Sequence, residues 1–498
     1  MKKMKHMLAV LLTVIMTLAM TTTAFAAETQ TGNLTVKVNA NNTLEGQTIK
    51  VYKLFDLTVS GDKYAYTVNE TYKTAIAAAL GLESTATSEN LYKKLAEYTS
   101  DSAEVQKFAD DFTAAALENK TPATATAEKL GKIESHTFEG LDYGYYLVYQ
   151  TGTKEIQSSL VSVNEASVKV DLKGEAPSID KTANTDTVEI GQVVTYTITG
   201  TIPDTTGYDS YVYKIKDTLT TGLDFVSEQG VAPEDTDYVV SVKIGAGNAE
   251  TQTAVLSGDD KRTMTLDLST WIMNKQGSKG SEFTVTYYAK VNANAVVTEK
   301  NSASLEYGNA PDNTTTTTPS EVKTPTYPLQ IRKFARGDEQ NFLDGATFRL
   351  YPTEEDAKAN TNAIGVTGGN GNYTVDKNSK SFDMVSAKTA IAEGMNLKLN
   401  GLAAGTYWLV ETEAPQGYNG VTAPIKITIT KSGDTEVNNW TIRKDNENED
   451  DKIIDIENST GTILPGTGGM GTILFTVVGI ALVLIIAASF VISRRKRA

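Results

Sequence analysis

The 498-residue chain contains no cysteine and only two histidines, His6 and His136. The lack of cysteine excludes disulfide bonds, thiol catalysis and zinc ribbons. Two histidines leave little scope for Ser–His catalysis or histidine-based metal sites. Positive charge is also scarce, since 46 Lys and Arg stand against 61 Asp and Glu, and the net charge of −15 argues against nucleic acid as a partner. No pattern in the sequence indicates a cofactor or a metal ion.

The remaining composition is typical of a globular, strand-rich protein, with 40% hydrophobic residues, 21% charged residues and 23 tyrosines. The length is enough for about three domains of roughly 150 residues each. Short strand-like stretches recur along the chain, such as Val193 to Thr199 and Ile425 to Thr430, and they favour β-sandwiches. From Glu70 to Leu130, Ala, Leu, Lys and Glu dominate instead. This composition predicts a helical insertion, either a binding subdomain or a packing cover.

Proline-marked joints divide the chain into three predicted domains, at residues 27–175, 176–324 and 325–462. The threonine-rich run from Pro311 to Ser320 has no apolar content and is the clearest linker.

The two ends of the chain predict export and anchoring. Residues 1–26 have the basic start and short apolar stretch of a secretory signal peptide, with cleavage between Ala26 and Ala27. The alternative is an N-terminal anchor. Residues 472–492 carry no charge and are long enough to span a membrane. The basic tail at residues 493–498 would hold that end in the cytoplasm, so the rest of the chain would lie outside.

The pentapeptide Leu464-Pro465-Gly466-Thr467-Gly468 stands just before this span. Pentapeptide, apolar span and basic tail, in that order, resemble the LPXTG-type cell-wall sorting signal of Gram-positive surface proteins. The resemblance implies that a sortase cuts between Thr467 and Gly468 and keeps Thr467 as an acyl-enzyme.

In the third predicted domain, three chemically reactive side chains fall on apolar strand faces. Lys333, Glu411 and Asn458 each share a face with apolar residues two and four positions earlier, because alternate residues of a strand point the same way. A lysine that points into a core is costly unless it is neutral or paired.

This pattern, together with the stretch from Tyr407 to Tyr418, resembles the collagen-adhesin (Cna) B-type domains of sortase-assembled pilins and their E-box. In that family the lysine and the asparagine form an intramolecular isopeptide bond, so the resemblance implies a Lys333–Asn458 bond. Burial favours the neutral, nucleophilic lysine amine. Glu411 would polarise the asparagine amide and shuttle protons as ammonia leaves. The alternative is a buried Lys333–Glu411 ion pair, with Asn458 as a turn residue.

The second predicted domain repeats the pattern with different spacing, since Lys181, Asp217 and Asn301 also lie on apolar faces. Middle domains of the same family are similar, with aspartate in place of glutamate. The resemblance implies a Lys181–Asn301 bond with Asp217 as proton shuttle, whereas the competing interpretation makes Asp217 an ordinary turn acid. The first domain breaks the pattern: Lys37 is predicted to face water and Tyr149 stands where the acid would be, so no internal bond is expected there.

Lys173 is predicted to be exposed at the joint between the first two domains, because its neighbour Leu172 points inward. It resembles the pilin-motif lysine, which in such pilins attacks the sortase acyl-enzyme, although Asp171-Leu172 stands where Tyr-Pro is usual. The resemblance implies a bond from Thr467 of one subunit to Lys173 of the next. Lys169 is the nearest rival, and an ordinary solvated lysine is the alternative.

The sequence therefore predicts a mainly β chain of tandem immunoglobulin-like (Cna B-type) β-sandwiches, with a helical insertion in the first. The implied function is the shaft subunit of a covalently polymerised pilus on a Gram-positive cell wall, used in adhesion and colonisation. Implied partners are a pilin-polymerising (class C) sortase, a housekeeping sortase, further copies of the chain, accessory pilins, peptidoglycan and host surface ligands. The alternatives are a singly displayed wall-anchored adhesin and a wall-anchored surface enzyme.

Overall fold

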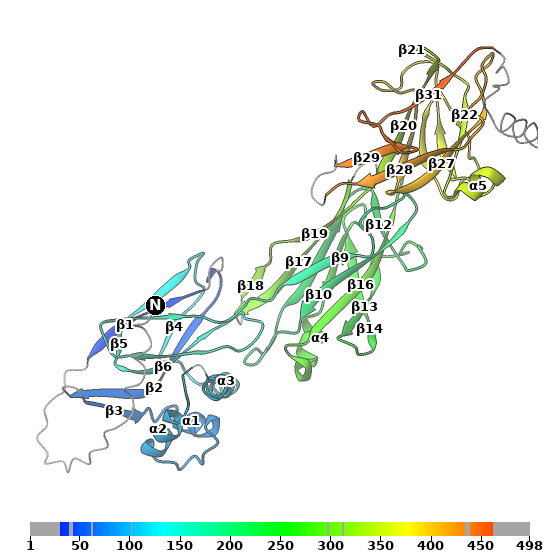
Figure 1. Ribbon diagram of the computed structural model, residues 1–498. Helices are drawn as coiled ribbons and strands as arrows, with labels where there is room; N and C mark the ends of the chain where they lie inside the picture. The colour runs from blue at the N-terminus through cyan, green and yellow to red at the C-terminus, as the bar shows by residue number, and fades with distance from the viewer. Residues whose placement is uncertain are drawn as a thin grey trace, which may run out of the picture. The chain divides into compact units, whose positions relative to one another are not determined.

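A computed structural model of the chain describes residues 30–38, 43–60, 63–100, 102–295, 298–310, 313–433 and 439–461 (Figure 1). The chain separates into two compact units, the first ending at Pro325 and the second starting at Thr326, except that residues 189–191 belong to the second. The predicted signal peptide, sorting pentapeptide, membrane span and basic tail lie outside the described residues. Within the described ranges, no helix has the length and apolar character needed to cross a membrane.

Among the described residues, the N-terminal part of unit 1 contains two sheets and the helices α1, α2 and α3 (Figure 1). One sheet has the strand order β5-β1-β8, and the other has the order β3-β2-β6-β7 with β4 paired to β2. The bounds of these elements are β1 (Thr31–Lys37), β2 (Ile49–Ser60), β3 (Lys63–Val68), α1 (Lys73–Ala79), α2 (Ser88–Ala96), α3 (Ala103–Glu118), β4 (Ala125–Ala127), β5 (Ser135–Asp142), β6 (Gly144–Gln150), β7 (Ser159–Val163) and β8 (Ser167–Asp171).

The sheet that contains β2 and β6 is apolar on both faces because it is the middle of three layers. On one face, Val51 packs in a buried cluster with Val36 of β1. On the other face, Tyr52 packs against the helices, with its ring edge-on to Phe112 at 5.6 Å between centroids. The predicted helical insertion is therefore confirmed as α1 to α3, and these helices cover the sheet. A packing cover on the sheet was one of the two roles predicted for this insertion.

The rest of unit 1 is dominated by one long sheet with the strand order β18-β17-β11-β15-β14-β13-β16-β10-β9, to which β12 and β19 add at the side. Lys181 on β9 contacts Asp217 on β11 and Asn301 on β17, so the two ends of this path meet and the sheet folds over a shared core. The bounds are β9 (Ile179–Ala183), β10 (Val193–Thr201), β11 (Tyr213–Leu219), β12 (Leu223–Val226), β13 (Asp237–Ile244), β14 (Ala249–Ser257), β15 (Thr263–Asp267), α4 (Ser269–Asn274), η1 (Gln276–Ser278), β16 (Glu282–Val291), β17 (Thr298–Ala310), β18 (Asn313–Thr316) and β19 (Ser320–Pro325).

The interpretation of the threonine-rich run as a linker was wrong for the part that the structure describes. Asn313–Thr316 forms β18, and Ser320–Pro325 forms β19. Both strands pair antiparallel with β17. A low apolar content does not prevent pairing, because a sheet edge offers backbone hydrogen bonds and β-branched threonine suits an extended backbone.

The described part of unit 2 contains two sheets with the strand orders β21-β20-β26-β24-β23 and β25-β22-β27-β28-β29-β30, and β31 pairs parallel with β20. Lys333 of the first sheet contacts Glu411 of the second, so the two sheets pack face to face as a sandwich. The bounds are β20 (Tyr327–Ala335), β21 (Asp338–Phe342), β22 (Thr347–Tyr351), α5 (Glu354–Ala359), β23 (Val366–Gly369), β24 (Asn372–Val375), β25 (Met384–Val385), β26 (Leu397–Leu402), β27 (Gly405–Glu413), β28 (Ile425–Lys431), β29 (Trp440–Lys444), β30 (Glu447–Asn448) and β31 (Ile454–Asn458).

The predicted fold class is confirmed: the described chain is mainly β, with successive sandwiches and a helical insertion near its start. Strand alternation explains this result, because β10 alternates buried and half-buried residues along its whole length, and β16 does so after its exposed first residue. The boundary between the first two predicted domains, at residues 175 and 176, stays a prediction.

Candidate functional sites: two buried lysine–carboxyl–asparagine groups

Unit 1 brings Lys181, Asp217 and Asn301 together in its core. The three side chains come from β9, β11 and β17, and their residues are 4%, 0% and 0% exposed. The lysine Nζ donates to Asp217 Oδ2 and to Asn301 Oδ1. Asp217 lies in the middle of β11 and is fully buried, so it is not the turn acid of the competing interpretation.

A tyrosine that sequence analysis did not single out completes this group. Tyr287 on β16 donates from its hydroxyl to Asp217 Oδ2 at 2.7 Å, and it accepts a hydrogen bond from Asn301 Nδ2 at 3.1 Å. Its ring and that of Tyr196 lie 5.4 and 5.3 Å from the Lys181 amine, measured to the ring centroids. The amine is therefore enclosed by two aromatic faces, a carboxyl group and an amide.

Burial controls the protonation of this group. It lowers the pKa of Lys181 to about 8, although the nearby Asp217 carboxylate acts in the opposite direction. Burial also raises the pKa of Asp217. Both shifts favour the uncharged pair, a neutral amine beside a protonated carboxyl group. Within the described residues, Asp217 Oδ1 has no hydrogen-bond partner, which is more costly for a carboxylate than for an acid.

The turn after β11 is fixed by a second buried carboxylate that sequence analysis missed. Glu299, two residues before Asn301, accepts hydrogen bonds from the Thr220 hydroxyl and from the Gly222 N–H, the latter at 2.8 Å. A Cβ atom on Gly222 would lie 2.2 Å from the Glu299 carboxyl carbon and 2.7 Å from the backbone Cα of Ala295, which cannot move aside easily, so glycine is required there. This contact joins the β11 turn to β17, the strands that carry Asp217 and Asn301.

Unit 2 holds a second group of the same kind, formed by Lys333 on β20, Glu411 on β27 and Asn458 on β31. The lysine Nζ donates to Asn458 Oδ1 and lies 3.2 Å from Glu411 Oε1. Asn458 Nδ2 donates directly to the same carboxylate oxygen at 2.8 Å. Burial lowers the pKa of Lys333 to about 8, against the opposing charge of Glu411. Asn458 closes β31 as a buried strand residue, which contradicts its alternative role as a turn residue.

Two further contacts hold this second group in place. The Val421 N–H donates to Glu411 Oε2 at 2.6 Å, which directs the other carboxylate oxygen toward the lysine and the asparagine. Asn396, fully buried, accepts from the Lys333 N–H at 2.7 Å and donates back to the Lys333 carbonyl at 3.2 Å. Asn396 was missed because an asparagine between Met395 and Leu397 resembles an ordinary turn residue.

Both arrangements place an amine that is easily deprotonated against a side-chain amide, with a carboxyl group alongside. A neutral lysine amine is a nucleophile, an amide carbonyl is its electrophile, and the carboxyl group can move protons between them. All six residues are at most 8% exposed, so bulk water has little access to the reacting groups. The geometry suits formation of an amide bond between lysine and asparagine.

The first predicted domain has no such group at the positions considered. Lys37 is exposed, and Tyr149 is buried, which raises its pKa well above its ordinary value and keeps its hydroxyl protonated. Among the described residues, no three His, Asp or Glu side chains are arranged to hold a metal ion.

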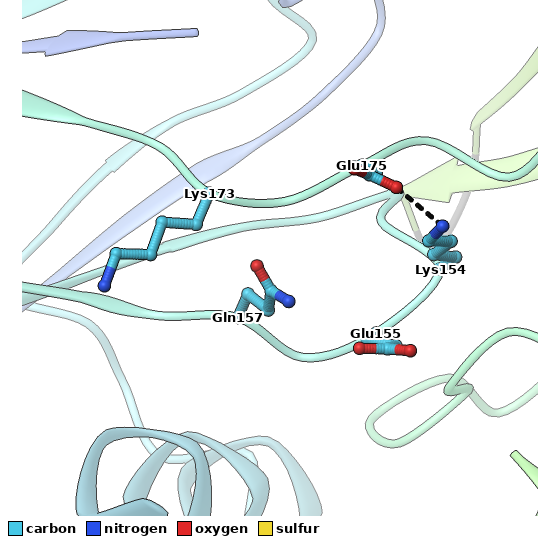
Figure 2. Close-up of a pocket in the computed structure, with 5 residues that line it drawn as sticks. All are labelled: Lys154, Glu155, Gln157, Lys173 and Glu175. Atoms are coloured by element: carbon cyan, nitrogen blue, oxygen red, sulfur yellow. Dashed lines mark ion pairs between the residues drawn. The ribbon is translucent and has the colours of Figure 1, made fainter. Parts of the chain in front are cut away.

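Lys173 follows β8, and its side chain is exposed while Leu172 is buried. It lines a polar pocket with Lys154, Glu155, Gln157 and Glu175, and Figure 2 shows it extending away from the Lys154–Glu175 ion pair. Its Nζ donates to Gln106 Oε1 of α3 at 3.2 Å. The rival Lys169 is also exposed, on β8. Thr467 and the rest of the pentapeptide lie outside the described residues.

Fold and sites together define a chain of tandem β-sandwiches that carries two buried lysine–carboxyl–asparagine groups. Residues 328–444 match the family model of the SpaA prealbumin-like fold domain. This match confirms the resemblance to pilin domains for most of the third predicted domain. No curated protein sequence matched the chain.

Solved structures of Gram-positive backbone pilins are similar to the chain in architecture. The T6 backbone pilin of serotype M6 Streptococcus pyogenes is 15% identical, with a TM-score of 0.46, over 88% of this chain and 100% of that one. The full-length major pilin SpaD of Corynebacterium diphtheriae is 19% identical, with a TM-score of 0.43, over 87% and 98%. The pilus 2b backbone protein of group B streptococcus is 22% identical, with a TM-score of 0.38, over 57% and 99%.

Proposed function

We propose that the chain is the shaft subunit of a covalently polymerised pilus on a Gram-positive cell wall, and that internal Lys181–Asn301 and Lys333–Asn458 isopeptide bonds stabilise it. The observation that carries this proposal is the contact of each buried lysine amine with an asparagine amide beside a carboxyl group. If the lysine only formed an ion pair, its burial would cost desolvation free energy. It is useful where the neutral amine must react.

The bond-forming step balances without any co-reactant. The neutral Lys333 amine attacks the side-chain carbonyl carbon of Asn458, and Glu411 accepts a proton from the attacking nitrogen. Glu411 then returns a proton to the asparagine nitrogen, which leaves as ammonia. One carbon–nitrogen bond forms, one breaks, and nothing is oxidised or reduced. Folding supplies the catalysis, because it holds the reacting groups in contact and away from water. The protein would thus be no enzyme beyond this reaction on itself.

Polymerisation would use a different lysine. A pilin-polymerising sortase would cut after Thr467 and hold it as an acyl-enzyme, and the Lys173 amine of the next subunit would displace the sortase to form an amide. The exposure of Lys173 supports this role, because the amine must reach an enzyme from outside. A housekeeping sortase would transfer the last subunit to peptidoglycan. Copies of the chain, accessory pilins and host surface ligands complete the proposed set of partners.

The test is mass spectrometry of peptides from wall material of cells that express the full chain. We expect two cross-linked peptide pairs, each one ammonia lighter than the sum of its parts, at Lys181–Asn301 and Lys333–Asn458. A third pair should join Thr467 to Lys173. Wall extracts should also contain a ladder of covalent oligomers. A single species with both internal bonds but no ladder would support the singly displayed adhesin instead, and the absence of all cross-links would refute the proposal.

A further inference from the structure

The two buried groups differ in how the acid reaches the asparagine. In unit 2, Glu411 Oε1 accepts directly from Asn458 Nδ2 at 2.8 Å. In unit 1, the acid is an aspartate, one methylene shorter, and the hydrogen bond of Asn301 Nδ2 goes to the Tyr287 hydroxyl. That hydroxyl in turn donates to Asp217 Oδ2 at 2.7 Å. Tyr287 therefore lies between the acid and the leaving nitrogen of Asn301. In unit 2, the described contacts place no residue between Glu411 and Asn458.

We propose that Tyr287 relays the proton from Asp217 to the leaving nitrogen of Asn301 as the Lys181–Asn301 bond forms. This inference rests on the proposed internal bond and adds a residue to its mechanism. Tyr287 is fully buried and touches both the acid and the reacting amide, so it meets the geometric requirement for a proton-transfer group.

The relay can be followed proton by proton. The neutral Lys181 amine attacks the carbonyl carbon of Asn301 while Asp217 still carries its proton. In the tetrahedral intermediate the lone pair of the asparagine nitrogen is no longer delocalised into the carbonyl, so this nitrogen can accept a hydrogen bond where it previously donated one. Asp217 gives its proton to the Tyr287 oxygen while the Tyr287 hydroxyl proton moves to that nitrogen, and the resulting Asp217 carboxylate takes the surplus proton from the attacking lysine nitrogen. Ammonia leaves, and both Asp217 and Tyr287 end as they began.

The surroundings of Tyr287 favour transfer through an intact hydroxyl. Burial, next to the Asp217 carboxyl group, raises the pKa of Tyr287 well above its ordinary value. A free phenolate is therefore disfavoured, and the tyrosine must give and receive its protons in one concerted exchange. Tyr287 also stacks on Tyr196 at 5.7 Å between ring centroids, which fixes the ring plane and thus the hydroxyl position.

The experiment compares Tyr287→Phe with wild type by following both bonds in the same full-length molecules. Synthesis is stopped, samples are taken over time, and the cross-linked fraction at each site is measured by peptide mass spectrometry. We expect the Lys181–Asn301 bond to form at least about a hundred-fold more slowly in the variant, because general acid catalysis typically contributes about 10²- to 10⁴-fold. The Lys333–Asn458 bond, which has its own acid, should form at the wild-type rate.

Tyr196→Phe is the matched control. It removes a hydroxyl from the other ring that faces the Lys181 amine, whereas the tyrosine hydroxyl that donates to Asp217 and accepts from Asn301 is that of Tyr287. Equal slowing in both variants would assign the effect to packing and overturn the relay. Folding is checked by protease resistance against the unlinked Asp217→Ala variant. A Tyr287→Phe protein that is less resistant than this reference would also overturn the relay.

Two further outcomes separate the relay from the proposed function. A wild-type rate in Tyr287→Phe would refute the relay and leave the internal bond intact. Wild-type protein without any Lys181–Asn301 bond would refute the bond itself, and the relay with it.

Discussion

Replacing Lys333 by methionine should destabilise unit 2 by the full contribution of its internal bond. Methionine removes the nucleophile but keeps an unbranched apolar side chain, so no amine is left buried without a partner. Glu411 and Asn458 can keep their hydrogen bond to each other at 2.8 Å. The substitution therefore isolates the covalent bond from the electrostatics of the site better than a change of the acid would.

The magnitude follows from the length of chain that the bond closes. Lys333 and Asn458 are 125 residues apart. By analogy with a disulfide of this loop length, the bond would remove about 5 kcal/mol of unfolded-state entropy, and measured cross-links typically contribute about 2–4 kcal/mol. We therefore expect Lys333→Met to lower the free energy of unfolding of unit 2 by about 2–5 kcal/mol.

Tryptophan fluorescence during urea unfolding can measure this change in the full chain. Two of the three tryptophans, Trp408 and Trp440, belong to unit 2, and Trp271 belongs to unit 1. In a Trp271→Phe background the signal reports unit 2 alone. Lys358→Met, at an exposed lysine on α5 that pairs with Glu354, is the matched control and should change the free energy of unfolding by less than about 1 kcal/mol.

An unchanged unfolding transition in Lys333→Met would refute this reasoning. So would an equal loss in both lysine variants, since that would mean that the substitution of any lysine, and not the bond, accounts for the change.

Three other outcomes are expected. Lys173→Ala should abolish the covalent ladder in wall extracts, whereas Lys169→Ala should leave it intact; the reverse result would move the linkage to Lys169. Asp217→Ala should restore one ammonia mass at the middle site while the unit 2 bond still forms, and a fully linked variant would exclude Asp217 as the acid. Bond formation at Lys333, followed in newly synthesised full chain as it folds at different pH values, should accelerate from pH 6, reach half of its maximum rate near pH 8 and level off above that. The reason is that only the neutral amine can attack, and its fraction rises with pH because the pKa of Lys333 is lowered to about 8. A rate that does not change with pH would contradict this prediction.

Strand alternation accounts for most of what could be predicted. Every second residue of a strand faces the same side, so a local pattern was enough to place Lys181, Asp217 and Lys333 on inward faces, where the structure has them. The same rule placed Lys37 and Lys173 outward, and both are exposed. These properties depend on neighbours within a few residues, which the sequence contains directly.

Contacts between distant strands were harder to predict. Alternation places Tyr287 on the inward face of β16, but nothing local indicates that its hydroxyl meets Asp217, which lies 70 positions earlier. Glu299 was missed because its partners, Thr220 and Gly222, are nearly eighty positions earlier. The threonine-rich run was mistaken for a linker because a lack of apolar residues says nothing about a free strand edge nearby.

The sequence by itself determined the class of fold, the acidic and cysteine-free character of the chain, and which lysines point inward. It determined these because composition and period-two alternation are local properties of the chain. Only the tertiary structure decided that Lys181 meets Asn301 across 120 residues, that Tyr287 stands between Asp217 and the amide, and that Glu411 needs no such intermediary. Distances of a few ångströms between different strands depend on register and on how sheets pack, and these are set by the whole core together.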